Sequence, residues 1–72
     1  MQTIVIDFAG DVSNPSQVLA DILRESGVKG TEIEVGQGLA YVQIDDYDDA
    51  EVEEAWTQAM ENDDRVTGWD VA

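Results

Sequence analysis

The sequence contains no cysteine and no histidine among its 72 residues. Disulfides, thiolate metal sites and iron–sulfur clusters are therefore excluded, and the commonest general base and metal ligand is missing as well. Basic residues are also scarce, because only Arg24, Lys29 and Arg65 stand against 17 carboxylates and the formal net charge is −14. Such a chain is repelled by nucleic acid and by anionic membranes and is attracted to basic surfaces. We therefore expect a basic, nucleic-acid-binding protein as the partner, with no direct contact to nucleic acid or to a membrane.

Targeting signals are also missing from the first ten residues, MQTIVIDFAG, which hold neither a basic segment nor a long apolar run. A signal peptide needs the first, and a membrane-spanning helix needs about 20 apolar residues. We therefore expect a cytoplasmic protein. The hydrophobic content of 43% is enough for one layer of helices on a sheet, and a chain this short has room for one modest core. We expect residues 1–72 to form a single domain.

Alternating apolar and polar residues predict four strands, at residues 2–8, 31–35, 39–45 and 65–72. The turn Gly36-Gln37-Gly38 predicts a hairpin between the second and third strands. The side chains expected to face the helices from the first and third strands are Ile4, Ile6, Phe8, Ala40, Val42 and Ile44. The opposite face of the sheet is then expected to show Val5, Asp7, Glu32, Glu34, Leu39, Tyr41 and Gln43.

Two amphipathic segments predict helices. The first begins after Asn14, a capping residue followed by Pro15, and stops at Gly27; its apolar stripe is Val18, Leu19, Ile22 and Leu23. The second has capping-box spacing at Asp48 and Glu51, and its stripe is Val52, Ala55, Trp56, Ala59 and Met60. The order βαββαβ, with two right-handed crossovers and both helices on one face of a four-stranded antiparallel sheet, predicts an α+β ferredoxin-like sandwich.

The most acidic segment is residues 45–64, which no basic residue interrupts. Its carboxylates are the candidate partner-binding residues: Asp45, Asp46, Asp48, Asp49, Glu51, Glu53, Glu54, Glu61, Asp63 and Asp64. A helix of about 16 residues spans roughly 24 Å, so these charges would lie about 2.4 Å apart on average, comparable with the roughly 1.7 Å charge spacing of duplex DNA. Glu51, Glu54 and Glu61 are then candidates to take the place of successive phosphates.

Three explanations of this acidity remain open. Acids near a helix start are favoured by the helix dipole, and a run of charge is usually a solvated face. An ordinary exposed helix, however, mixes both signs for support between residues four apart. A specific binding surface accounts for the missing lysines, as does adaptation to high salt, where acid-rich and lysine-poor surfaces are the norm. Plain solubility is the third explanation.

Other functions fit the residues poorly. Tyr41 is alone among carboxylates on the open sheet face, whereas RNA-binding domains of this topology place aromatic and basic residues there; a protein partner could still dock on Leu39 and Tyr41. A calcium loop starting at Asp46 fails, because Ala50 and Glu51 occupy its fifth and sixth positions. Catalytic carboxylates need a desolvated pocket, which so small a core does not provide. We expect that the protein is not an enzyme and that it binds neither a metal nor a cofactor.

The loop after the first strand, AGDVSNP, has neither the paired cysteines of metallochaperones nor the basic phosphate loop of acylphosphatases. In its size, its acidic segment 45–64 and its lack of catalytic residues, the chain resembles small acidic phage proteins that mimic DNA, above all anti-CRISPR proteins, with uracil-glycosylase inhibitors as a comparable case. The resemblance implies a monomer in a bacterial host cell that occludes a Lys/Arg-lined channel of a CRISPR effector, where the effector reads the target-adjacent motif of duplex DNA. The alternative is a salt-adapted structural or regulatory domain of a halophile.

Overall fold

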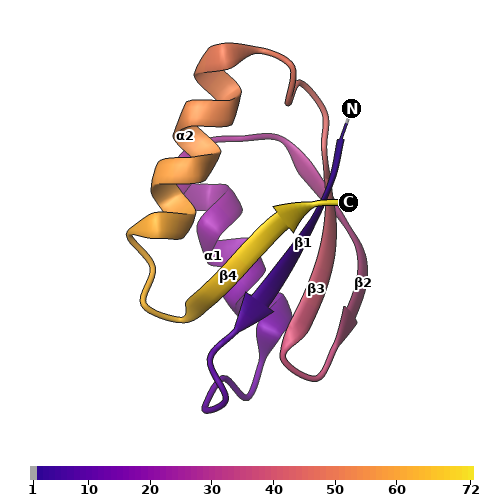
Figure 1. The fold of residues 1–72 in the computed structure, drawn as a ribbon, viewed down its shortest axis with the longest axis vertical. Helices are drawn as coiled ribbons and strands as arrows, with labels where there is room; N and C mark the ends of the chain where they lie inside the picture. The colour runs from indigo at the N-terminus through magenta and orange to yellow at the C-terminus, as the bar shows by residue number, and fades with distance from the viewer. Residues whose placement is uncertain (1) are drawn as a thin grey trace.

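The computed structural model describes residues 2–72, which form four strands and two helices in the order βαββαβ. Strands β1 (Gln2–Phe8), β2 (Gly30–Gly36), β3 (Leu39–Ile44) and β4 (Val66–Val71) form one antiparallel sheet in the order β2-β3-β1-β4. Helices α1 (Pro15–Ser26) and α2 (Ala50–Glu61) lie together on one face of this sheet (Figure 1). The predicted α+β ferredoxin-like arrangement is confirmed.

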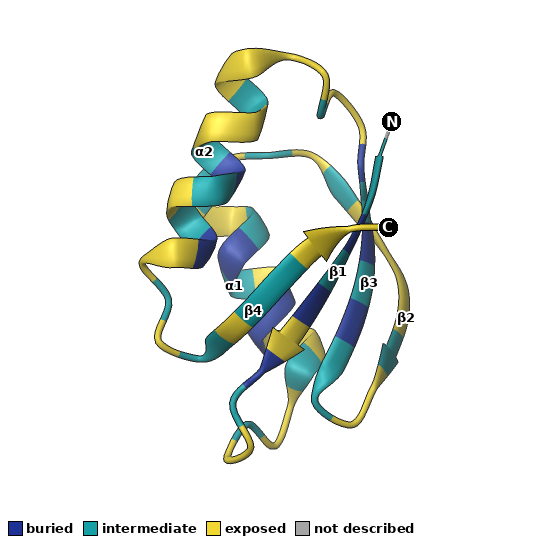
Figure 2. Cartoon of the chain, viewed as in Figure 1, coloured by how far each residue is buried: buried dark blue, intermediate teal, exposed yellow. Residues whose placement is uncertain are grey.

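The core lies between the helices and the sheet. Alternate residues of β1 and β3 face the helices, as predicted, and the buried side chains from both layers are Ile4, Ile6, Phe8, Val18, Leu19, Ile22, Ala40, Val42, Ile44, Trp56 and Met60 (Figure 2). Burying each of the larger side chains stabilises the fold by about 1.5–3 kcal/mol. Within residues 2–72 no polar or charged residue is fully buried, and neither helix is long and apolar enough to span a bilayer.

Both ends of α1 follow the predicted signals. The Asn14 side chain accepts a hydrogen bond from the Gln17 amide at 3.3 Å, and Pro15 begins the helix, where no intrahelical donor is needed. Gly27 ends it with φ 71°, a left-handed conformation that glycine adopts without steric cost, and its amide donates to the Leu23 carbonyl. Local sequence therefore determines this helix.

The N-terminal cap of α2 is Asp49, so the predicted cap at Asp48 is wrong. The Asp49 side chain accepts from the Glu51 amide at 2.9 Å. A turn closed by the bond from the Asp49 amide to the Asp46 carbonyl comes first, and the chain becomes helical one residue later than predicted. The helix has 12 residues, so it spans about 18 Å rather than the roughly 24 Å expected from the sequence.

A bulge in β2 changes which of its side chains face the helices. The pairing with β3 shifts between Glu32 and Glu34, which leaves Ile33 as an extra residue that is 53% exposed. Glu32 therefore lies opposite Val42, on the helix side of this edge strand, and its predicted place on the open face is wrong. Glu34, opposite Tyr41, remains on the open face.

Candidate functional site

Nine of the ten candidate carboxylates are exposed. They follow the β3–α2 loop, the outer side of α2 and the start of the α2–β4 loop, a largely exposed stretch in Figure 2. We call this set the acidic surface: Asp45, Asp46, Asp48, Asp49, Glu51, Glu53, Glu54, Glu61 and Asp64. None of the nine takes part in an ion pair among residues 2–72. Their charges are therefore left for solvent or for a partner to neutralise.

Asp63 is the tenth candidate, and its environment differs. Its side chain is only 7% exposed and pairs with Arg65, with 2.7 Å between Oδ2 and Nη2. Its Oδ1 also accepts from Nε and from the backbone amide of Arg65, both at 2.9 Å. The hydrogen bonds from Arg65 hold the pKa of the Asp63 carboxyl below its usual value. Because its charge is already balanced, Asp63 lies outside the acidic surface.

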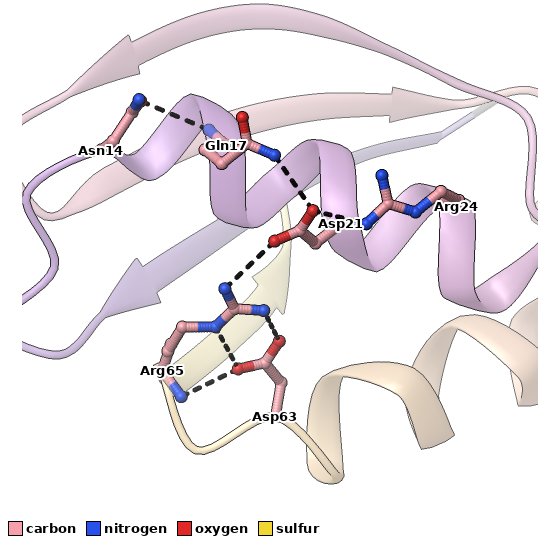
Figure 3. Close-up of polar contacts among 6 residues, drawn as sticks. All are labelled: Asn14, Gln17, Asp21, Arg24, Asp63 and Arg65. Atoms are coloured by element: carbon pink, nitrogen blue, oxygen red, sulfur yellow. Dashed lines mark hydrogen bonds and ion pairs between the residues drawn. The ribbon is translucent and has the colours of Figure 1, made fainter.

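Arg65 also reaches α1 (Figure 3). Its Nη1 donates to Asp21 Oδ2 at 3.2 Å, while Oδ1 of the same carboxylate accepts from Gln17 at 3.0 Å and from Arg24 at 2.8 Å. These bonds, first that from Gln17 and then that from Arg65, lower the pKa of Asp21. Two of the three cations are thus engaged away from the acidic surface. This cluster was not predicted, because Arg65 and Asp21 lie 44 positions apart; the one local signal in the sequence is the spacing of Asp63 and Arg65.

The acidic surface is divided into two groups of charge along α2. Seven members lie at its N-terminal end: Asp45, Asp46, Asp48, Asp49, Glu51, Glu53 and Glu54. Glu61 and Asp64 lie at the other end, seven helical positions or about 10.5 Å beyond Glu54. The exposed position between them is held by uncharged Gln58, whose amide donates to Glu54 at 3.2 Å. The average spacing expected from the sequence therefore resolves into two groups, because residues 55–60 hold no carboxylate and the loops carry five of the nine acids.

The three glutamates proposed as phosphate mimics do not share one line. At about 100° per residue, Glu54 and Glu61 both point away from the buried Trp56 of α2. Glu51 lies about 60° round the helix from Glu54, where it lines a hollow between α1 and α2 together with Lys29. Glu54 and Glu61 therefore form the outer ridge, and Glu51 lies beside it at the hollow that Lys29 also lines.

Part of the N-terminal group also stabilises the helix itself. Asp49 caps α2, and Glu51 and Glu53 lie in its first turn, where each negative charge gains about 0.3–1 kcal/mol from the helix dipole.

Burial raises the pKa of the Tyr47 phenol, and the charge of Glu53 raises it further. Among residues 2–72 no cluster of three acidic side chains converges closely enough to hold a metal ion. The arrangement presents divergent charge to a large surface rather than a chelating site.

The fold and the acidic surface together define a small α+β protein in which α2 and its flanking loops carry nine exposed carboxylates without an ion pair among residues 2–72. Comparison with protein-family models, curated proteins and solved structures found no match for the chain.

Proposed function

We propose that this protein is an anti-CRISPR-like inhibitor whose acidic surface mimics DNA and blocks a basic, target-adjacent-motif-reading site of a CRISPR effector complex. The observation that carries the proposal is the set of nine exposed carboxylates with no ion pair among residues 2–72. Such a field speeds the approach of a Lys/Arg-lined channel and favours it over neutral surfaces. The protein acts by binding, as a phage-encoded monomer in the host cytoplasm, without catalysis or cofactor.

The division of the acidic surface supports this form of mimicry. The two groups are separated by about 10.5 Å along the helix, comparable with the roughly 12 Å width of the major groove that lies between the phosphate backbones of duplex DNA. Between them Gln58 is an exposed, uncharged residue. Arginines that read guanine in this groove form bidentate bonds to neutral acceptors, and Gln58 offers one amide oxygen at the corresponding place.

The test is a gel-shift competition on a panel of purified CRISPR effector complexes with duplex DNA that carries the target-adjacent motif. The wild-type protein is expected to displace the duplex from at least one effector, and less well as salt rises. The triple variant Glu51→Lys, Glu54→Lys, Glu61→Lys is expected to lose this competition while keeping its circular dichroism spectrum.

The matched control carries the same change of charge elsewhere: Asp11→Lys, Glu32→Lys and Glu34→Lys, all at exposed positions outside the acidic surface. It is expected to compete within about threefold of the wild type, since distant charges are largely screened. An equal loss of competition in both triple variants would mean that net charge alone, and not the acidic surface, causes the inhibition. Failure of the wild type on every effector would rule out the proposed target.

The second candidate is a salt-adapted structural or regulatory domain of a halophile. It is favoured by exposed carboxylates that lie elsewhere on the surface: Asp7, Asp11, Glu25, Glu32, Glu34 and Asp70. Thermal melts at increasing salt separate the two candidates. A fold lost below about 1 M salt and recovered above it supports salt adaptation, because screening is then needed to offset self-repulsion. A folded protein in dilute buffer supports the inhibitor.

A further inference from the structure

The face of the sheet that the helices leave uncovered carries an apolar strip along its two central strands. Val5 of β1 lies directly opposite Tyr41 of β3, and Leu39 lies on the same face two residues before Tyr41. All three are half-buried, and no hydrogen bond of the Tyr41 side chain is formed within residues 2–72. The strip therefore has apolar area to cover and a phenol group available to a partner.

Carboxylates flank this strip on both edge strands. Asp70 of β4 lies opposite Val5, and Glu34 of β2 lies opposite Tyr41, so one row of four residues crosses the whole sheet. Asp7 adds a third carboxylate beside Leu39. None of the four strands contains a lysine or an arginine. With neighbouring strands about 4.8 Å apart, Asp70 and Glu34 are separated by roughly 14 Å.

We propose that this open face is a docking surface for a basic amphipathic helix of a partner protein. A helix is about 10–12 Å across with its side chains, so it fits over the central strands between the two flanking carboxylates. Its apolar stripe would cover Val5, Leu39 and Tyr41, while lysines or arginines on its two sides reach Asp70 and Glu34. A helix packed on a sheet face is one of the standard layer arrangements of protein domains.

Charge and area both argue against a second copy of this chain as the occupant. Two such faces would oppose the same carboxylates, Asp7, Glu34 and Asp70, with no cation on any strand to offset them. Four strands of about six residues also cover only roughly 300–400 Å², about half of the 800 Å² that each partner buries in a stable interface. A short helix matches this area better than a folded domain.

The proposal does not depend on the inhibitor function, because the open face belongs to the sheet, whereas the acidic surface lies on α2 and the loops at its two ends (Figure 1). The experiment is a titration of the ¹⁵N-labelled protein with a synthetic 15-residue helical peptide that carries a leucine stripe flanked by lysines. A scrambled peptide of the same composition is the control. We expect the amide signals of β1 and β3 around Val5, Leu39 and Tyr41 to shift with the first peptide only. Shifts in α2 with both peptides report attraction to the acidic surface.

Two double variants test the two parts of the surface. Val5→Thr with Tyr41→Thr removes apolar contact and is expected to lower the affinity for the leucine-stripe peptide at least about tenfold. Glu34→Gln with Asp70→Asn keeps the shape of both exposed side chains and is expected to lower the same affinity roughly fivefold. The matched control, Glu54→Gln with Glu61→Gln on α2, removes as much charge and is expected to change the affinity by less than about twofold.

Three results would overturn the proposal: sheet shifts that are equal with the scrambled peptide, shifts confined to α2, or unchanged affinity in the Glu34→Gln, Asp70→Asn variant. Concentration-dependent shifts of the same sheet amides without peptide would also overturn it, because they would identify a second copy as the occupant. If the threonine variant fails to fold by circular dichroism, the charge variant decides, since both of its sites are exposed.

Discussion

The guanidinium of Arg65 donates to the carboxylate of Asp21 at 3.2 Å, across 44 positions of sequence. This bond connects the α2–β4 loop to α1, and the same guanidinium holds Asp63 at 2.7 Å (Figure 3). In a chain with three basic residues, one of them therefore serves to join two elements of the helical layer. Removing the Arg65 guanidinium is therefore expected to lower the stability of the fold more than the loss of another surface charge does.

Arg65→Gln is expected to lower the melting temperature by roughly 4–8 °C. The substitution leaves the largely buried Asp63 carboxylate without its counter-charge and removes the link to Asp21. Arg24→Gln is the control, because the Arg24 side chain is 73% exposed and its one ion pair within residues 2–72 is with Asp21; we expect a change below about 2 °C. Scanning calorimetry of both variants at neutral pH and equal salt checks the difference. Equal losses would mean that Arg65 acts only through net charge.

The contribution of Arg65 is expected to depend on pH. The pKa values of Asp63 and Asp21 are both lowered in the folded protein, and a lowered carboxyl pKa adds stability above the unfolded value of about 4, which is lost as pH falls through the folded value. The gap in melting temperature between wild type and Arg65→Gln is therefore full at pH 7 and closes below about pH 4. Melts at pH 7, 5, 4 and 3 measure it. A gap that stays constant down to pH 3 would contradict the assigned ion pairs.

Asp49→Ala is expected to cost about 1 kcal/mol of stability, because the side chain that accepts from the Glu51 amide is lost. Asp48→Ala removes the same charge from the neighbouring exposed position, where no such bond exists among the described residues. Both variants relieve the same repulsion, so the difference between them isolates the cap. Urea unfolding followed by circular dichroism measures it. The opposite order would place the cap at Asp48, as the capping-box spacing had indicated.

Sequence periodicity was enough to predict the fold, because the alternation at Ile4, Ile6 and Phe8 and the stripe of α2 each require a buried face. Periodicity gave the wrong position where one extra residue, in a strand or before a helix, shifted the residues next to it. The bulge at Ile33 reversed the side of the sheet to which Glu32 belongs, and the turn before α2 moved its cap to Asp49. Neither event leaves a distinctive residue pattern.

The acidic surface was predictable as a list of exposed residues but not in its arrangement. Exposure follows from charge, since burying an unpaired carboxylate is prohibitively costly. Whether a carboxylate is paired depends on which distant segment reaches it, and the approach of Arg65 to Asp21 is a tertiary event. The gap between Glu54 and Glu61 follows from the uncharged residues 55–60 and is visible in the sequence, whereas the place of Asp45, Asp46 and Asp48 in a loop before α2 is not.

Gly30→Ala is expected to destabilise the protein by about 1 kcal/mol or more. An added Cβ would lie 2.8 Å from Leu23 Cδ2 and 2.9 Å from Ile44 Cδ1, closer than van der Waals contact permits, and Ile44 is fully buried. Gly36→Ala at the other end of β2 meets nothing within 4 Å, so we expect it to be neutral or slightly stabilising. Chemical unfolding of the two variants tests this pair. Equal stability would show that the Leu23 side chain moves aside freely.

Trp56→Phe is expected to cost less than Met60→Ala, although tryptophan is the larger side chain. Both residues are buried, at 0% and 1% exposure, but the indole Nε1 of Trp56 has no hydrogen-bond partner among residues 2–72. An unpaired buried donor costs about 1–3 kcal/mol, and phenylalanine removes that cost while keeping most of the ring, whereas Met60→Ala only opens a cavity worth about 2–5 kcal/mol. Urea unfolding followed by circular dichroism compares the two, because Trp56→Phe removes one of the two indoles whose fluorescence would otherwise report unfolding. A larger loss for Trp56→Phe would mean that the indole nitrogen has a partner in solution, such as an ordered water.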